Sequence, residues 1–292
     1  MALMTGTYVV ALVEEWTASG HLRPAAPFQA AAAMLVQEPL VPRQPDRLLF
    51  EVAPLLLLAA AVLAAGVLPL APGTVMVDMA TGVLFVNAAL AYVMVALVMA
   101  GWGPHAGYAL VAGWRFLGQL IAYSMLIVMS IAAVAMQAQS LSMTDVVSSQ
   151  DPIWNIVTQP LGFALFWLAA MAVSFVPPFD LPIASELAGG VFGEYTGPRL
   201  AVLRYARLVL VLTLAAAINV FYLGGYLGPL LPACLWMAIK TFAVATAMLA
   251  GGKLVPRMPL DLLLEWGWKL GIPLALANIL IVGFRLLVAR AL

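Results

Sequence analysis

The sequence predicts an all-α, polytopic integral membrane protein, and three observations carry that prediction. Of the 292 residues, 65% are hydrophobic and 9% are charged, whereas soluble domains are about half apolar and about a quarter charged. The apolar residues gather in runs of roughly 20, which is the length of helix that crosses ~30 Å of hydrocarbon. The lysine and arginine residues avoid every second loop between these runs.

Seven apolar runs are long enough, or nearly so, to span a bilayer. Each is expected to be a helix, because lipid offers no partner for unpaired backbone groups. In chain order the runs are 52–70, 82–100, 116–136, 161–176, 200–223, 230–250 and 270–288. The N-terminal apolar piece, residues 1–13, is shorter than a full span and is a candidate for an eighth, truncated helix. It lacks the basic start and the cleavage site of a signal peptide.

The basic residues predict the orientation, because cytoplasmic loops carry an excess of Lys and Arg. With the segment before the first confident span in the cytoplasm, three loops on the other side contain no Lys or Arg: 71–81, 137–160 and 224–229. Three longer polar segments then face the cytoplasm: 14–51, 177–199 and 251–269. We therefore expect a single domain in the inner, or cytoplasmic, membrane of the cell, with a partner approaching from these segments.

Composition excludes several classes of function. The formal net charge of zero argues against a nucleic-acid partner. Cys234 is the single cysteine, so it cannot form an intrachain disulfide, and one thiol cannot hold zinc or an iron–sulfur cluster. With only two histidines as well, we expect this chain to hold neither a metal site nor a catalytic centre of its own.

The stretch SFVPPFDLPIASELAGGVFGEYTG, residues 174–197, is unusual in so apolar a chain. It places three acids in one loop, namely Asp180, Glu186 and Glu194. One interpretation is a solvated loop whose acids pair with basic residues of the next span: Arg199, Arg204 or Arg207. The other is a loop folded back at membrane depth around a cavity, where irregular backbone is tolerated because it does not face lipid.

Part of this stretch, PPFDLPIASELAGGVFGEYTG, resembles a loop of subunit 1 of respiratory complex I, the membrane subunit that forms the quinone chamber. Four other segments resemble that family in its own order: QEPLVPRQPDRLLFEVAP, YALVAGWRFLGQLIAYS, FYLGGYLGP and PRMPLDLLLEWGWKLGIPLALAN. The resemblance covers most of the chain from about residue 20. The same family supplies the membrane anchor of group 4 [NiFe]-hydrogenases and of formate hydrogenlyase.

The resemblance implies an eight-helix subunit between a peripheral electron-transfer arm and antiporter-like and small membrane subunits. It would anchor that arm and link it to quinone or to proton translocation. Iron–sulfur clusters, with NiFe or flavin, would belong to partner subunits, and the resemblance leaves open whether quinone binds at the junction. By position, the junction or quinone-cavity loop would include Phe179, Asp180, Glu186, Glu194, Tyr195 and Arg199. The interface with the peripheral arm would include Glu38, Arg115, Arg257, Asp261 and Lys269.

Two departures from the family concern proton movement. Ser124 and Arg207 fall where the family carries glutamates, and arginine cannot give up its proton. Carboxylates buried in a membrane are usually retained for proton or ion work, and none lies near the middle of a predicted span. Lys240 is the ionisable residue near a span's centre, so it is the candidate for a proton path, although a lysine bonded to helix carbonyls explains it as well. Coupling through this chain is expected to be weakened or rerouted.

Two alternatives follow from the same sequence. A degenerate structural anchor with no quinone or proton role is favoured by the missing acids. A stand-alone transporter predicts broken helices in matching halves of the chain around a midplane site, and the sequence shows no such pair.

Overall fold

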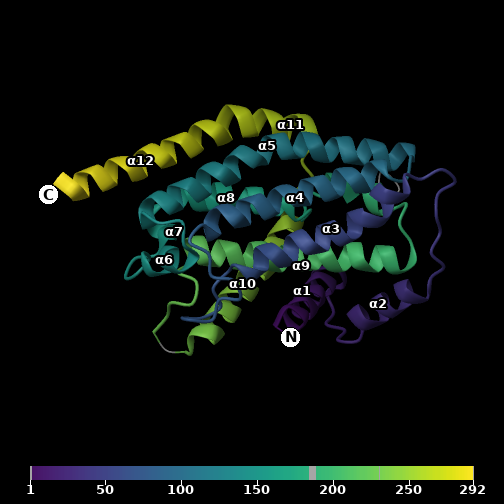
Figure 1. Ribbon diagram of the computed structural model, residues 1–292, viewed down its shortest axis with the longest axis horizontal. Coiled ribbons are helices and arrows are strands. Elements are labelled where there is room, and N and C mark those ends of the chain that lie inside the picture. Colours follow the sequence, from purple (N-terminus) through teal and green to yellow (C-terminus); the bar gives the residue numbers. More distant parts are fainter. Residues whose placement is uncertain (1, 184–188, 230, 292) are drawn as a thin grey trace.

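The protein is a helical bundle in the computed structural model, which describes residues 2–183, 189–229 and 231–291. Within those ranges, six helices are long and apolar enough to cross a membrane. They are α3 (Arg47–Gly66), α4 (Gly82–Trp102), α5 (Gly107–Ala138), α9 (Gly197–Tyr222), α10 (Ala233–Leu254) and the continuous helix of α11 and α12 (Leu260–Ala289). Helices α3, α4, α5 and α9 run side by side (Figure 1). The predicted all-α, polytopic fold is confirmed.

The remaining predicted span is the short helix α8 (Pro160–Val173), which packs between α5 and α9. Its 14 residues reach only ~21 Å, less than the ~30 Å of a bilayer core. The short helices α6 (Met143–Ser148) and α7 (Asn155–Thr158) precede it, and an irregular loop follows it. The described part of the loop after α8 is mostly buried against other parts of the protein, a setting in which irregular backbone is tolerated.

Two helices begin earlier than their apolar runs predict, at the end of the bundle that is rich in Lys and Arg. Helix α3 starts at Arg47 because the Asp46 carboxylate accepts hydrogen bonds from the backbone N–H groups of Leu48 and Leu49, at 3.2 and 3.3 Å. This is the favourable arrangement for an N-cap. Helix α5 has 32 residues, or ~48 Å, so its first turns extend beyond the hydrocarbon and carry Arg115.

The last span also starts before residue 270, so the expected cytoplasmic segment 251–269 is only partly a loop. Helix α11 (Leu260–Trp266) passes through a π-helical turn, Gly267–Gly271, into α12 (Ile272–Ala291). In the apolar 18-residue stretch of this long helix only 17% is buried, compared with 61% in the corresponding stretch of α9. Figure 1 shows it along one side of the bundle, with its C-terminal end projecting past α5.

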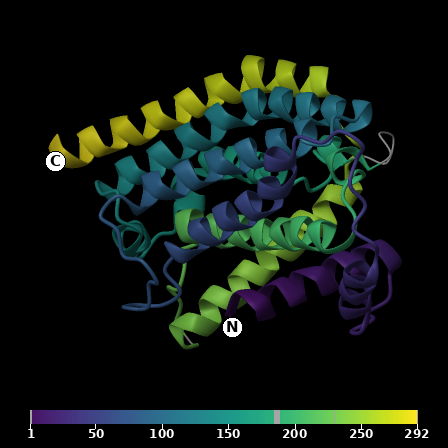
Figure 2. The ribbon, with the colours of Figure 1, turned by 45° about the vertical axis from the view of Figure 1, so that its right-hand side comes forward.

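The N-terminal region differs most from prediction. Helix α1 (Ala2–Ser19) is longer than the apolar piece 1–13 because it continues through Glu14 and Glu15. It packs on α9 and α10, beneath the bundle in Figure 2. Helix α2 (Ala26–Val36) lies in a segment where we expected only polar connection, and none of its side chains is buried.

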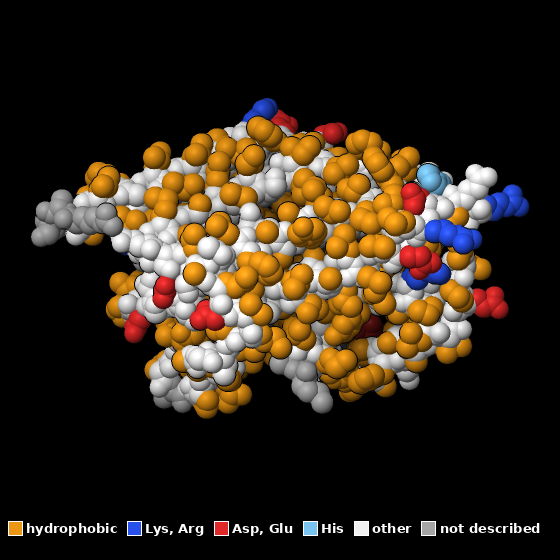
Figure 3. Space-filling view, viewed as in Figure 1, with side chains coloured by type: hydrophobic (Ala, Val, Ile, Leu, Met, Phe, Trp, Pro, Cys, Tyr) orange, Lys and Arg blue, Asp and Glu red, His pale blue; other side chains and the backbone are white. Residues whose placement is uncertain are grey.

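The charges fit the predicted orientation. Figure 3 shows a broad apolar belt, with lysine and arginine side chains gathered mainly at the end where α3 and α9 begin. This end is the one that the distribution of basic residues assigns to the cytoplasm.

Candidate functional site at the basic end of the bundle

The loop that follows α8 folds back against the bundle instead of extending into solvent. Phe179, Asp180 and Tyr195 are 4%, 7% and 1% exposed, respectively, while Glu194 is half-buried. The interpretation as a solvated loop is therefore wrong for the described part of this segment. Glu186 lies outside the described residues.

Gln119, on α5, holds this loop in place. It is fully buried, and its Nε2 donates hydrogen bonds to the carbonyl oxygens of Ala172 (2.8 Å) and Phe179 (2.9 Å). One side chain thereby satisfies backbone acceptors at the end of α8 and in the loop, which a buried segment requires. We did not predict a role for Gln119, although a glutamine inside an apolar run was a visible signal.

The segment that follows α10 lies directly on the same loop. Arg257 Nη2 is 2.8 Å from Asp180 Oδ2, and the backbone N–H of Met258 donates to the carbonyl of Pro178 at 3.2 Å. A Cβ atom on Gly252 would overlap the carbonyl of Pro177, so glycine allows this close approach. The structure thus joins a predicted loop residue, Asp180, to a predicted interface residue, Arg257.

The starts of α3 and α9 are joined by an aromatic and ionic cluster. The rings of Phe50 and Tyr195 stack with centroids 4.4 Å apart, and the Arg199 guanidinium lies 5.3 Å from the Phe50 centroid. Arg199 donates to both carboxylate oxygens of Glu51, from Nε at 2.8 Å and from Nη2 at 2.5 Å. Burial, followed by the nearby Glu51 charge, raises the pKa of the Tyr195 phenol, so that phenol stays neutral.

The segment before α3 crosses the start of α9. The Thr196 hydroxyl accepts a hydrogen bond from the backbone N–H of Leu40 at 2.8 Å and donates to the carbonyl of Glu38 at 3.2 Å. Gly197 has a φ of +64°, and a Cβ there would lie 2.9 Å from the carbonyl oxygen of Gln37. Both its conformation and its clearance therefore require glycine. The Glu38 side chain itself is exposed.

These contacts unite three segments that are far apart in sequence. We call the resulting surface the platform, formed by residues 37–51, by the described parts of the loop 177–199 (177–183 and 189–199) and by residues 252–258. Three other predicted interface residues lie outside it. Asp261 and Lys269 follow on the last long helix, where Lys269 pairs with Glu265 at 2.6 Å, and Arg115 is half-buried on α5.

Comparison of the chain with known protein families shows to which family a subunit with this platform belongs. The chain matches the NADH dehydrogenase family over residues 18–283, a range that begins in α1 and ends within α12. The chain belongs to this family, whose members resemble subunit 1 of complex I. The match includes every segment of the platform, and it begins only at the end of α1.

In this family member, Arg207 is paired with an acid that we did not predict. Its Nη1 lies 2.6 Å from Glu14 Oε1 on α1, and its Nη2 donates to the Phe175 carbonyl at 3.4 Å. One interpretation of the loop paired its acids with Arg199, Arg204 or Arg207; among the described residues, Arg199 pairs with Glu51 and Arg207 with Glu14. Arg207 joins α1 to α9, and Arg204 is exposed.

Lys240 lies at the opposite end of the bundle from the platform. It is 8% exposed, and its ammonium contacts backbone carbonyls of the loop between α9 and α10. The proton path predicted for it stays a prediction, and the described contacts of its ammonium include no acid.

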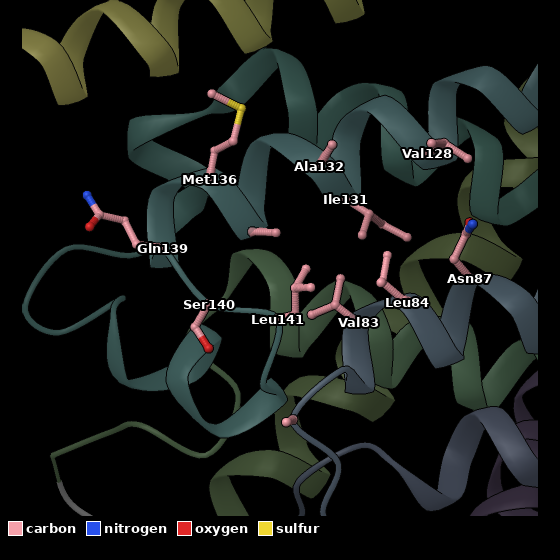
Figure 4. Close-up of a pocket in the computed structure, with 12 residues that line it drawn as sticks. Val83, Leu84, Asn87, Val128, Ile131, Ala132, Met136, Gln139, Ser140 and Leu141 are labelled. Atoms are coloured by element: carbon pink, nitrogen blue, oxygen red, sulfur yellow. The ribbon is translucent and has the colours of Figure 1, made fainter.

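A groove near that same end lies between α4 and α5 (Figure 4). Its volume is about 620 Å³, and its walls are mostly apolar, with Asn87 and Gln139 among the polar exceptions. The junction at which the resemblance leaves quinone binding open is instead at the platform. There the rings of Phe179 and Tyr195 are buried, and the Tyr195 hydroxyl donates to the Ala100 carbonyl at 3.4 Å.

Proposed function

We propose that this chain anchors the peripheral redox arm of a complex I-like respiratory or group 4 hydrogenase-type oxidoreductase, with the platform as the docking surface. Membership of the family makes it a membrane subunit of a multi-subunit, NADH dehydrogenase-like complex. The observation that carries the proposal is the joining of three distant segments into one surface at the basic end of the bundle. A membrane protein without a soluble partner has no evident need for such a surface.

The platform is connected mechanically to the membrane helices. Asp180 and Arg257 link the loop after α8 to the segment after α10, while Glu51 and Arg199 link α3 to α9. Charge-assisted hydrogen bonds of this kind are strong and directional. A shift of the docked arm would therefore move these helix ends together, which is what an anchor that transmits movement needs.

The redox chemistry belongs to partner subunits in this proposal. Among the described residues, no group of three or more His, Cys, Asp or Glu is arranged to hold a metal ion. Iron–sulfur clusters, with flavin or a NiFe centre, would lie in the docked arm, and antiporter-like and small membrane subunits would lie beside this chain in the membrane. Docking of the arm on the platform does not require quinone.

A second candidate is an anchor with no proton role, and two observations favour it. Arg207 forms an ion pair with Glu14, and the Lys240 ammonium donates hydrogen bonds to backbone carbonyls. A relay needs groups that exchange protons near the ambient pH, and neither arrangement supplies a pair of such groups.

Crosslinking in the native membrane tests the docking surface. A photoreactive residue replaces Glu38 or Val255, two exposed positions on the platform, in a chain purified with its complex. We expect both positions to capture a peripheral redox subunit, which mass spectrometry and metal analysis of the purified complex would identify. The matched control is exposed Ser148 at the other end, which should capture none. Capture of the same soluble subunit from Ser148, or of no subunit from the platform, would overturn the proposal.

A further inference from the structure

The outer end of α9 is built around the ammonium of Lys240. Helix α9 ends at Tyr222, and the chain turns through Gly224 and Gly225, which have φ angles of +73° and +51°. This turn aims three backbone carbonyls at Lys240 Nζ: Leu223 at 2.7 Å, Gly225 at 3.3 Å and Leu227 at 2.7 Å. An ammonium has three N–H donors, so these three acceptors satisfy it completely.

Two indole rings complete the surroundings of the ammonium. Lys240 Nζ lies 4.1 Å from the ring centroid of Trp154 and 5.5 Å from that of Trp236. Both distances lie within the range of cation–π attraction. A Cβ on Gly224 would come within 2.9 Å of Trp154 Nε1, so this indole packs directly on the turn that supplies the carbonyls.

Two buried amide side chains also contact the turn and the end of α9. Gln150 Nε2 donates to the Val220 carbonyl at 2.7 Å, and Gln150 Oε1 accepts from the Gly224 N–H at 2.9 Å. Asn155 Nδ2 donates to the Phe221 carbonyl at 2.9 Å. The last carbonyls of a helix lack partners within the helix and carry its negative dipole end. These amides satisfy two of them and leave the turn carbonyls for a cation.

We propose that the turn 223–227 and the two indoles form a monovalent-cation site, and that the Lys240 ammonium is its permanently tethered occupant. Lys240 is then a positioning residue that fixes the outer α9–α10 connection. Its positive charge is balanced by carbonyl dipoles and by the end of α9, which do not exchange protons at ordinary pH. Once the side chain is shortened, the same site takes free ammonium or a small primary alkylammonium ion.

The test is chemical rescue of Lys240→Ala in the purified complex. Hydrogen exchange at the amides of residues 223–227 should rise by at least about tenfold, because charged hydrogen bonds of this strength hold the turn closed. Ammonium and methylammonium should reverse the rise with saturation. Sodium chloride at equal ionic strength, and tetramethylammonium, which has no N–H donor, should not reverse it.

Two variants serve as controls. Lys240→Met fills the space of the lysine stem, so exchange should rise and ammonium should not reverse it. Ile239→Ala shortens an exposed side chain next to Lys240 on the same helix and should leave the turn unchanged. Unchanged exchange in Lys240→Ala, or equal rescue by sodium chloride, would overturn the proposal.

A loss of assembly in Lys240→Ala is also informative. Production of the variant in medium with ammonium should then restore assembly, and a failure to do so counts against the site. In that case Trp154→Leu, which keeps the lysine and removes the nearer indole, should still raise exchange at residues 223–227, and unchanged exchange would refute the site outright. The protons moved per electron should be the same in Lys240→Met as in the unmodified complex, whereas a relay would show a loss.

Discussion

Asp180 and Arg257 form an ion pair in which one partner is buried and the other is half exposed. Their side chains are 9% and 50% exposed, respectively, and Arg257 Nη2 lies 2.8 Å from Asp180 Oδ2. The pair joins the loop after α8 to the segment after α10, so two polar segments that the sequence separates act as one surface. The asymmetry of burial decides how each partner responds to substitution.

We expect Arg257→Gln to destabilise the platform more than Asp180→Asn. Loss of Arg257 leaves a buried carboxylate without its cation, which costs about 2 kcal/mol or more. Loss of the Asp180 charge frees an arginine that water can reach, and costs about 1 kcal/mol. Thermal unfolding of the purified complex, together with the amount of peripheral subunit retained, measures both effects. The double variant should be no less stable than Arg257→Gln. Equal losses in the two single variants would show that burial of Asp180 does not control this contact.

The stability that the Glu51–Arg199 pair contributes should depend on the geometry of the arginine side chain as well as on its charge. Arg199 engages both carboxylate oxygens, which the single ammonium of a lysine cannot reproduce. Arg199→Lys should therefore lose most of the stability that Arg199→Gln loses, about 1 kcal/mol for a partly exposed pair. A double-mutant cycle with Glu51→Gln measures the coupling between the two side chains. If the Arg199→Lys complex is as stable as the unmodified complex, the contact of arginine with both carboxylate oxygens contributes nothing to stability.

Glu194 tests whether the platform shapes electron transfer. It is half-buried on the loop, and Glu194→Gln removes its charge while keeping its size. We expect electron transfer by the assembled complex to fall by roughly tenfold, corresponding to ~1.4 kcal/mol of barrier, with normal retention of the peripheral subunits. Asp78→Asn, an exposed acid at the other end, is the control and should have no effect. Normal turnover with normal assembly would show that the Glu194 charge has no role in electron transfer at the junction.

The helices were predictable because lipid imposes a simple rule on them. Runs of about 20 apolar residues must form helices where no water can satisfy the backbone, and the distribution of basic residues then fixes the ends. The helix α2 was missed because its segment was read as polar, although AAAAMLV is a good helix-forming sequence. The length of α8 depends on tertiary packing of the loop that follows it, so it could not be read from its apolar run.

The partners of the charged residues were not predictable in the same way. The loop acids stood out because they are rare, but two of the three cations considered as their partners, Arg199 and Arg207, pair with Glu51 and Glu14 instead. Glu51 lies 148 residues from Arg199, and Glu14 lies 193 residues from Arg207. Both acids border apolar runs, where a charge is easily read as the end of a span. Contacts at such separations are set by helix packing, which a single sequence does not specify.

The Glu14–Arg207 pair yields the last prediction. Arg207 is 13% exposed and Glu14 is 35% exposed, so each charge depends on the other within the bundle. Glu14→Leu should destabilise the chain by about 2–4 kcal/mol, because it leaves Arg207 without a compensating charge. The double variant Glu14→Leu and Arg207→Leu should recover most of that loss, since two apolar side chains replace a buried ion pair at little cost. Thermal unfolding in detergent measures the cycle, with Glu15→Leu on the same helix as control. A double variant that is less stable than either single variant would mean that α1 is held by other contacts and that the pair does not join it to α9.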